Sequence, residues 1–145
     1  MKHVLSIALV VTLAALIAPS FAEEPPYTEG NVMELTFVRT KTGGEDDYLK
    51  YLAATWKPLN EAAKKDGLIL SYRVIGGNPA NKDDWDLVLV VEYKNMAALD
   101  GMEEKMRPIM EKMVGSSSKA NEAATKRGEI REILGSKLCR ELILK

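Results

Sequence analysis

The stretch WDLVLVVEY (residues 85–93) decides the fold of this chain, because it places five consecutive aliphatic residues between Asp86 and Glu92. A short, Val-rich run behind the turn-forming residues 76–84 is typical of a β-strand. Since both faces of this strand are apolar, we expect it to lie in the middle of a sheet and to be buried on both faces.

Two earlier segments alternate between apolar and polar residues, which predicts half-buried strands. Residues 32–41 form the first, and Met33, Leu35 and Phe37 give it a strongly apolar face. Residues 68–75 form the second, in which Tyr72 and Arg73 point to opposite faces.

Between these strands, apolar residues at three- and four-residue spacing predict a helix over residues 45–66. Thr42 and Glu45 have the spacing of a capping box, in which two side chains satisfy backbone donors at a helix start. Pro58 removes one helical hydrogen bond, so we expect a kink or a break there.

A second long helix should start at Asn95 and carry a stripe of methionines, with Gly101 and Pro108 dividing it. A short helix over residues 119–127 follows. Residues 129–144 then favour two short strands joined by a hairpin turn at Gly135-Ser136, with a helix as the alternative.

The order strand, helix, strand, strand, helix, strand predicts an α+β fold of the ferredoxin-like βαββαβ type, with an extra C-terminal strand or hairpin. Such a sheet carries its helices on one face. The other face would expose apolar side chains that are too numerous to stay wet. We expect these to include Thr36, Val38, Ile69, Ile75, Val88 and Val90, and two copies placed face to face would bury them in a homodimer.

The N-terminus has the features of a Sec signal peptide. Lys2 precedes a run of 15 residues without charge, and small residues precede Glu23. We predict cleavage after Ala22 and a periplasmic or secreted protein. The uncharged run is short for a membrane span, which needs about 20 residues. The expected organisation is a signal peptide over residues 1–22, a disordered leader over 23–30 and one domain over 31–145.

Composition excludes several classes of site. Without residues 1–22 the chain keeps 123 residues, with 19 Lys and Arg against 21 Asp and Glu, which gives nucleic acid or anionic lipid no electrostatic reason to bind. The only histidine, His3, would leave with the signal peptide, so a Ser-His-Asp triad and His-ligated zinc or haem are excluded. We expect no metal and no cofactor. Cys139 is the only cysteine, so it has no partner for an intramolecular disulfide.

The order of elements resembles the dimeric α/β-barrel superfamily, as do the segments MELTFVR (residues 33–39), WDLVLVVEYK (residues 85–94) and NMAALD (residues 95–100). That superfamily includes antibiotic-biosynthesis-type monooxygenases, stress-responsive barrel proteins and chlorite-dismutase relatives. The resemblance covers residues 31–112 and implies a ferredoxin-like fold and a homodimer. Haem-binding members depend on a proximal His that the mature chain lacks. Cofactor-free monooxygenase members place a polar and aromatic pocket between helices and sheet, and Tyr51, Trp56 and Asn60 are matching kinds of residue.

Arg73 is the most informative internal charge, since it lies in mid-strand on the face that a second subunit would cover. A buried Arg needs a carboxylate, because an unpaired buried charge costs several kcal/mol. The arginine therefore forms a structural ion pair, with Asp86 as a candidate partner, or it clamps an anion or a carbonyl group of a ligand. The candidate ligand-binding residues are Arg73, Trp56, Tyr51, Tyr72, Asp86 and Glu34.

Three other groups have both a structural and a chemical interpretation. The methionine stripe at helical spacing is typical of a core, although thioethers also bind copper or apolar ligands. Asp83, Asp84 and Asp86 are oxygen ligands of the kind calcium uses, but they lack calcium-loop spacing and are also typical of a turn. Cys139 is a small strand residue, an intermolecular disulfide partner or a nucleophile without an activating His.

The sequence therefore predicts an exported, dimeric binding or assembly module with a modest pocket for a small molecule. The alternative is a cofactor-independent, monooxygenase-like enzyme that acts on a small aromatic or quinol-type substrate. In that enzyme Arg73 would stabilise developing negative charge.

Overall fold

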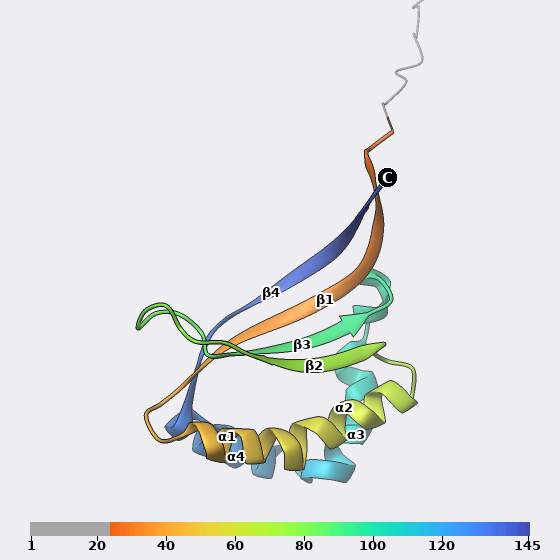
Figure 1. The fold of residues 1–145 in the computed structure, drawn as a ribbon. Coiled ribbons are helices and arrows are strands. Elements are labelled where there is room, and N and C mark those ends of the chain that lie inside the picture. Colours follow the sequence, from red (N-terminus) through yellow and green to blue (C-terminus); the bar gives the residue numbers. More distant parts are fainter. Residues whose placement is uncertain (1–23) are drawn as a thin grey trace, which may run out of the picture.

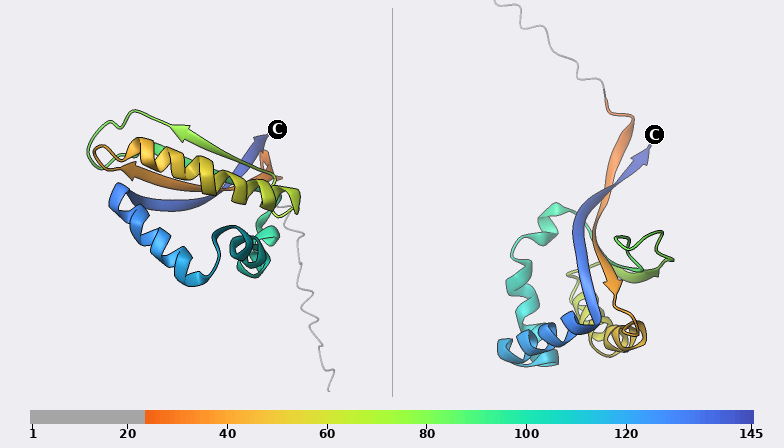
Figure 2. Two further views of the ribbon diagram at one scale, coloured as in Figure 1. Left: turned by 90° about the horizontal axis from the view of Figure 1, so that it is seen from below. Right: turned by 90° about the vertical axis from the view of Figure 1, so that its left-hand side faces the viewer.

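The computed structural model describes residues 24–145, and the predicted signal peptide lies outside this range. Its centre is one open antiparallel sheet of four strands in the order β2-β3-β1-β4. The strands are β1 (Tyr27–Thr40), β2 (Ser71–Gly76), β3 (Leu87–Tyr93) and β4 (Arg131–Leu144). The helices of the described residues lie on one side of the sheet and leave the other side uncovered (Figure 1 and Figure 2). The fold is α+β, as predicted.

The helices form three groups along the chain. The first is continuous and comprises α1 (Glu45–Tyr51), a π-helical turn η1 (Leu52–Trp56) and α2 (Lys57–Lys65). After β3 come a 3-10 turn η2 (Met96–Leu99) and α3 (Met102–Val114), and then α4 (Ser117–Ile130) leads into β4. Across residues 24–145, none of the helices combines the length and the apolar character needed to cross a membrane.

The first helix starts differently from the prediction. Its N-cap is Gly44, without a side-chain cap, so the capping box of Thr42 and Glu45 does not form. A tight turn precedes the helix, in which the Gly44 N–H donates to the Lys41 carbonyl at 2.8 Å. A Cβ on Gly44 would lie 2.5 Å from the carbonyl oxygen of Ile130. Close packing against the end of α4 therefore selects glycine at the cap position.

The predicted break near Pro58 takes the form of the π-helical turn. Proline has no N–H, so the carbonyl four residues earlier, that of Ala54, loses its helical partner. One residue before the proline, the Lys57 N–H bonds to the Leu52 carbonyl, which is the five-residue spacing of a π-helix. The helix thus widens ahead of Pro58 and continues to Lys65.

Of the predicted helix boundaries after β3, the one at Gly101 is observed, and those at Pro108 and Arg127 are not. Gly101, with a φ of 64°, separates η2 from α3 as predicted, whereas Pro108 lies inside α3. Helix α4 continues past Gly128 to Ile130, beyond its predicted end at Arg127.

Strand β4 is one continuous strand of 14 residues, so the predicted hairpin at Gly135-Ser136 is wrong. Its pairing with β1 shifts register, because Phe37 pairs with Gly135 and Val38 with Ile133. Leu134 is thus an extra residue on β4. A bulge of this kind accepts one more residue without ending the strand. The glycine therefore marks an irregularity inside a strand rather than a turn.

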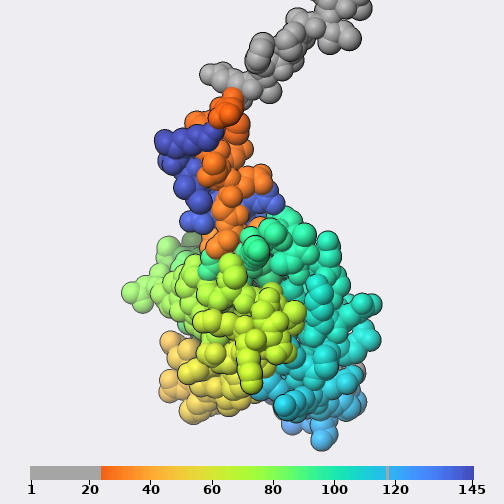
Figure 3. All heavy atoms as spheres, turned by 90° about the vertical axis from the view of Figure 1, so that its right-hand side faces the viewer, coloured from red at the N-terminus to blue at the C-terminus, as the bar shows by residue number. Residues whose placement is uncertain are grey.

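Strand β1 starts at Tyr27, so part of the predicted disordered leader is a strand. Residues 27–29 pair only with residues 142–144 of β4, past the point where the β1–β3 pairing ends at Val32. This two-stranded extension, the β1–β4 ribbon, projects beyond the body of the molecule (Figure 3). Its apolar side chains stand in solvent, and Leu144 is 78% exposed.

The core lies between the sheet and the helices, in two clusters. The members of the first are Val32, Ala63, Ile69, Tyr93 and Ile109. Those of the second are Val38, Tyr48, Leu52, Leu87 and Leu89. Strand β3 supplies both clusters and has an interior position in the sheet, and Leu87, Val88, Leu89 and Val90 are all buried. The predicted burial of its two faces is confirmed.

The uncovered face, called the open face below, differs in part from the prediction. Val38 and Ile69 belong to the helix-side core, and Thr36, which pairs with Leu89, shares that side. The register with β3 places Met33, Leu35 and Phe37 of β1 on the open face, where they are the neighbours of Glu92, Val90 and Val88 in that order. The apolar residues of the open face are Met33, Leu35, Phe37, Ile75, Val88 and Val90. Because β1 is apolar on both sides, its alternation alone could not orient it.

Candidate functional site

Arg73 lies on the open face, as predicted, and its side chain crosses the sheet. Arg73 is on β2 and pairs with Val90 on β3. Its guanidinium reaches Glu92, with Nη1 3.8 Å from Oε2, and Nη2 lies 3.6 Å from the sulfur of Met33 on β1. The stem of Arg73 thus lies over β3, and Val90 is only 1% exposed although no helix covers it.

Glu92 is the polar centre of the same face. Its carboxylate accepts a hydrogen bond from the Ser71 hydroxyl at 2.5 Å and another from the Asn31 amide at 2.8 Å. These two bonds, with a smaller contribution from the Arg73 charge, lower the pKa of Glu92 below its usual value. Each oxygen of the carboxylate accepts one hydrogen bond, and the lowered pKa makes Glu92 a poor proton acceptor.

Asp86, the carboxylate expected beside Arg73, bonds elsewhere. Its side chain accepts from the Thr40 N–H at 2.9 Å and from the Thr40 hydroxyl at 2.5 Å. These bonds tie the start of β3 to the end of β1, so the expected Arg73–Asp86 pair is replaced by Arg73 and Glu92. Asp86 closes the sheet at this end and does not approach the open face residues around Arg73.

The residues before β3 form a turn that holds itself together. The Asp84 carboxylate accepts from the N–H groups of Ala80 and Trp85, at 2.8 Å and 2.9 Å. Arg39 donates to the carbonyl oxygens of Asn81 and Asp84. Asp84 thus acts as a turn-forming residue. Across the described residues, no three His, Cys, Asp or Glu side chains come together as a metal site requires.

Trp56 and Tyr72 form an aromatic pair on the helix side of the sheet, at the free edge of β2. Their rings meet edge to face with centroids 5.3 Å apart. They line a groove of about 270 Å³, whose other walls are Leu49, Leu52, Ala53, Lys57 and Val74. The Tyr72 hydroxyl donates to Glu61, which raises the pKa of Tyr72. This groove is separated from Arg73 by the sheet, since neighbouring strand residues point to opposite faces.

Glu34 and Tyr51 occupy two further places. The Glu34 carboxylate accepts from the hydroxyl of Tyr93 at 3.1 Å, and burial, with the nearby Glu34 charge, raises the pKa of Tyr93. Tyr51 stacks on Tyr48 with centroids 6.0 Å apart and faces α4. The six predicted site residues are therefore distributed over separate places, and the side chains of Trp56 and Tyr72 pack against each other.

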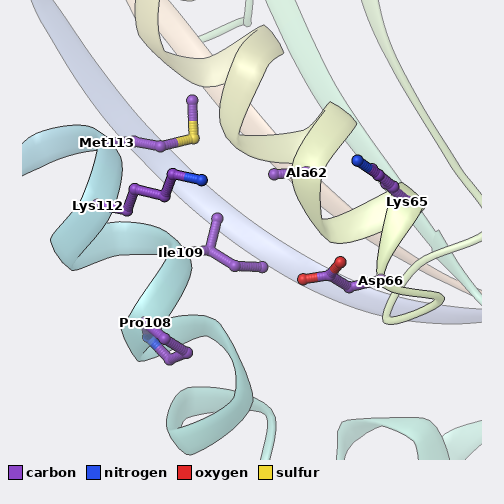
Figure 4. Close-up of a pocket in the computed structure, with 7 residues that line it drawn as sticks. All are labelled: Ala62, Lys65, Asp66, Pro108, Ile109, Lys112 and Met113. Atoms are coloured by element: carbon purple, nitrogen blue, oxygen red, sulfur yellow. The ribbon is translucent and has the colours of Figure 1, made fainter.

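A second hollow lies between α2 and α3 and has a volume of about 400 Å³. Figure 4 shows its residues, with Lys112 extending from α3 toward α2 and Ile109 at the centre. Lys65 and Asp66 from the end of α2 complete the polar part of the lining. Opposite charges at a solvent-facing rim offer no single kind of ligand an advantage.

Sequence reasoning missed a cluster of two tyrosines and two arginines where α1 meets the end of α4. The Arg127 guanidinium carbon lies 4.6 Å from the ring centre of Tyr51, and that of Arg131 lies 5.1 Å from the ring centre of Tyr48. Arg127 lies in the last turn of α4, whereas Arg131 is extended and begins β4. No local pattern could place them together, because the junction of α4 and β4 against α1 brings each arginine to its tyrosine.

Comparisons of the chain with protein-family models, with curated protein sequences and with solved structures find no significant match.

Proposed function

We propose that this chain is an exported, ferredoxin-like binding or assembly module that works as a homodimer, in which the open faces of two copies pack together. The observation that carries the proposal is the open face itself. On this face Met33, Leu35, Phe37 and Ile75 are partly exposed to solvent beside the buried Val88 and Val90, and Arg73 and Glu92 lie next to them. An apolar surface of this kind on a soluble domain marks an interaction site.

Two features support the ferredoxin-like and exported parts of the proposal. The strand order β2-β3-β1-β4, with a helix after β1 and helices after β3, agrees with a βαββαβ arrangement. Residues 1–22 have the composition of a signal peptide, and cleavage after Ala22 would leave a chain that starts four residues before Tyr27, the first residue of β1.

The dimensions of the sheet indicate how two copies would meet. Its four-stranded part is limited by the six residues of β2, and therefore measures about 20 Å by about 20 Å. A stable interface buries about 800 Å² on each partner, which is more than this area offers. The β1–β4 ribbon, in which residues 27–29 pair with residues 142–144, would have to contribute, and its exposed leucines and isoleucine suit that role.

Light scattering after size-exclusion chromatography tests the proposal. We expect the purified protein to be a dimer at micromolar concentration, and a Leu35→Glu variant to be monomeric, because the new carboxylate would be buried without a partner. The matched control is Leu49→Glu on the helix side, where the leucine is 39% exposed, and this variant should remain dimeric. A monomeric unmodified protein, or equal behaviour of the two variants, would contradict the proposal.

A cofactor-independent, monooxygenase-like activity is the second candidate, and the groove with Trp56 and Tyr72 favours it. An edge-to-face aromatic pair at the mouth of an apolar groove suits a flat aromatic substrate. Oxygen consumption on addition of a quinol tests the activity. We expect a Trp56→Ala variant to lose it and a Leu138→Ala variant, changed on the distant strand β4, to keep it.

A further inference from the structure

The cleft between the first helix, α3 and α4 differs chemically from the other hollows of the molecule. It has a volume of about 310 Å³. Its walls are mainly apolar and come from Leu59, Met110, Met113, Val114, Ala120 and Ala123. Tyr51, Thr55 and Arg127 supply its polar lining. Methionine side chains adapt to ligands of varied shape, so two of them in one wall suit a flexible guest.

The polar groups lie toward one end of this cleft. Tyr51 and Leu59 are eight residues apart on one continuous helix, which corresponds to about 12 Å along the axis. Arg127 lies over the Tyr51 ring and therefore at the Tyr51 end. The cleft thus has a cationic, aromatic end and an apolar body.

Two partly exposed arginines at this end have no carboxylate partner among residues 24–145. The Nε atoms of Arg127 and Arg131 are both buried and have no hydrogen-bond partner among the described residues. No ion pair of either arginine occurs within residues 24–145, where five other pairs form. The tyrosine rings and the C-terminal end of α4 offset part of the charge, but they supply no acceptor for the two N–H groups.

We propose that this cleft binds a medium-chain fatty acid, with the carboxylate at Arg127 and the alkyl chain between the three helices. Guanidinium groups bind carboxylates through paired hydrogen bonds, and the stacked Tyr48 and Tyr51 rings hold the two arginines in place. Arg131 lies one ring further from the cleft and adds positive potential. The site is on the helix side, so it is independent of the open face and of the dimer.

Calorimetric titration of the purified protein with decanoate tests the proposal. Decanol has the same chain without the charge, and acetate has the charge without the chain. We expect decanoate to bind at least about tenfold more tightly than either, since one charged hydrogen bond contributes about 1.4 kcal/mol or more. Equal binding of decanol and decanoate, or no binding of decanoate, would overturn the proposal.

Two substitutions locate the site. Arg127→Gln keeps much of the side chain but removes the charge, and we expect decanoate to bind at least about tenfold more weakly. The control is Arg107→Gln, at an exposed arginine of α3, which should leave the affinity unchanged. Circular dichroism and light scattering verify that both variants keep the fold and the oligomeric state. Unchanged affinity in folded Arg127→Gln protein would exclude this cleft as the binding site.

Discussion

The guanidinium of Arg73 on β2 lies 3.6 Å from the sulfur of Met33 on β1, two strands away. To reach it, the side chain must pass over β3, and its methylene stem shields Val90 on a face that has no helices. Long charged side chains often cover apolar surface in this way while their charged end stays in water. Arg73 therefore has a packing role in addition to its charge.

A pair of substitutions at Arg73 separates these two roles. Arg73→Met keeps an unbranched apolar stem, so we expect its free energy of unfolding to stay within about 0.5 kcal/mol of the unmodified protein. Arg73→Ala uncovers Val90 and should lose about 1 kcal/mol. Urea denaturation measures both. Equal losses in the two variants would show that the charge, rather than the stem, stabilises the face.

Glu92 predicts a pH dependence of stability. Its folded pKa lies below the value of 4.5 that it has when unperturbed, so its contribution to folding is complete above about pH 4.5 and decreases as the pH falls through the folded pKa. The free-energy difference between unmodified protein and Glu92→Gln, measured by urea denaturation from neutral pH to about pH 3, should therefore shrink on acidification. A difference that grows at low pH would contradict the assignment.

Asp86 and Thr40 form a coupled pair that a double-mutant cycle can measure. Asp86→Asn weakens the bonds from Thr40, and Thr40→Val removes the hydroxyl donor. Each variant should lose about 1–2 kcal/mol of unfolding free energy. The double variant should lose less than the sum, because both single changes act on the same hydrogen bond of 2.5 Å, which one weakens and the other removes. Strictly additive losses would mean that the bond does not contribute.

Gly44 and Gly128 should respond to alanine with opposite signs. A Cβ at Gly44 would meet the Ile130 carbonyl oxygen at 2.5 Å, whereas a Cβ at Gly128, within α4, meets nothing within 4 Å. Gly44→Ala should therefore lower the melting temperature, at a cost of about 1–3 kcal/mol. Gly128→Ala should raise the melting temperature, because alanine favours the helix and stabilises the protein by about 0.5–1 kcal/mol. Thermal unfolding of the two variants side by side is a direct measurement.

The sequence predicted elements better than it predicted contacts between them. The buried run of residues 87–91 identified an interior strand, because burial on both faces leaves a continuous apolar pattern. The start of the first helix was not predictable, since Gly44 is selected by Ile130, which is distant in the chain. The face of the sheet on which Val38 lies was not predictable either. Strand β1 is apolar on both faces, so its register with β3 decides which of them meets the helices.

The candidate sites show the same division. Strand alternation placed Arg73 correctly on the uncovered face, but it placed Ile69 there as well, which lies before the start of β2 and packs in the helix-side core. The cluster of Arg127 and Arg131 with Tyr48 and Tyr51 depends on α4 continuing to Ile130 and meeting α1 there. Local propensity cannot show that α4 continues through Gly128, because packing of the residues on either side of the glycine stabilises the helix.

Among residues 24–145, strand β1 is the first strand, and its partner along its whole length, β4, is the last. Thr28 pairs with Ile143, and the Lys145 N–H donates to the carbonyl of Pro26 at 3.0 Å. Pairings between such distant segments form slowly, because a long loop must close first. The sheet therefore cannot be completed until residues 131–144 are available for pairing, and a chain shortened before Arg131 would leave one edge of β1 without any partner strand.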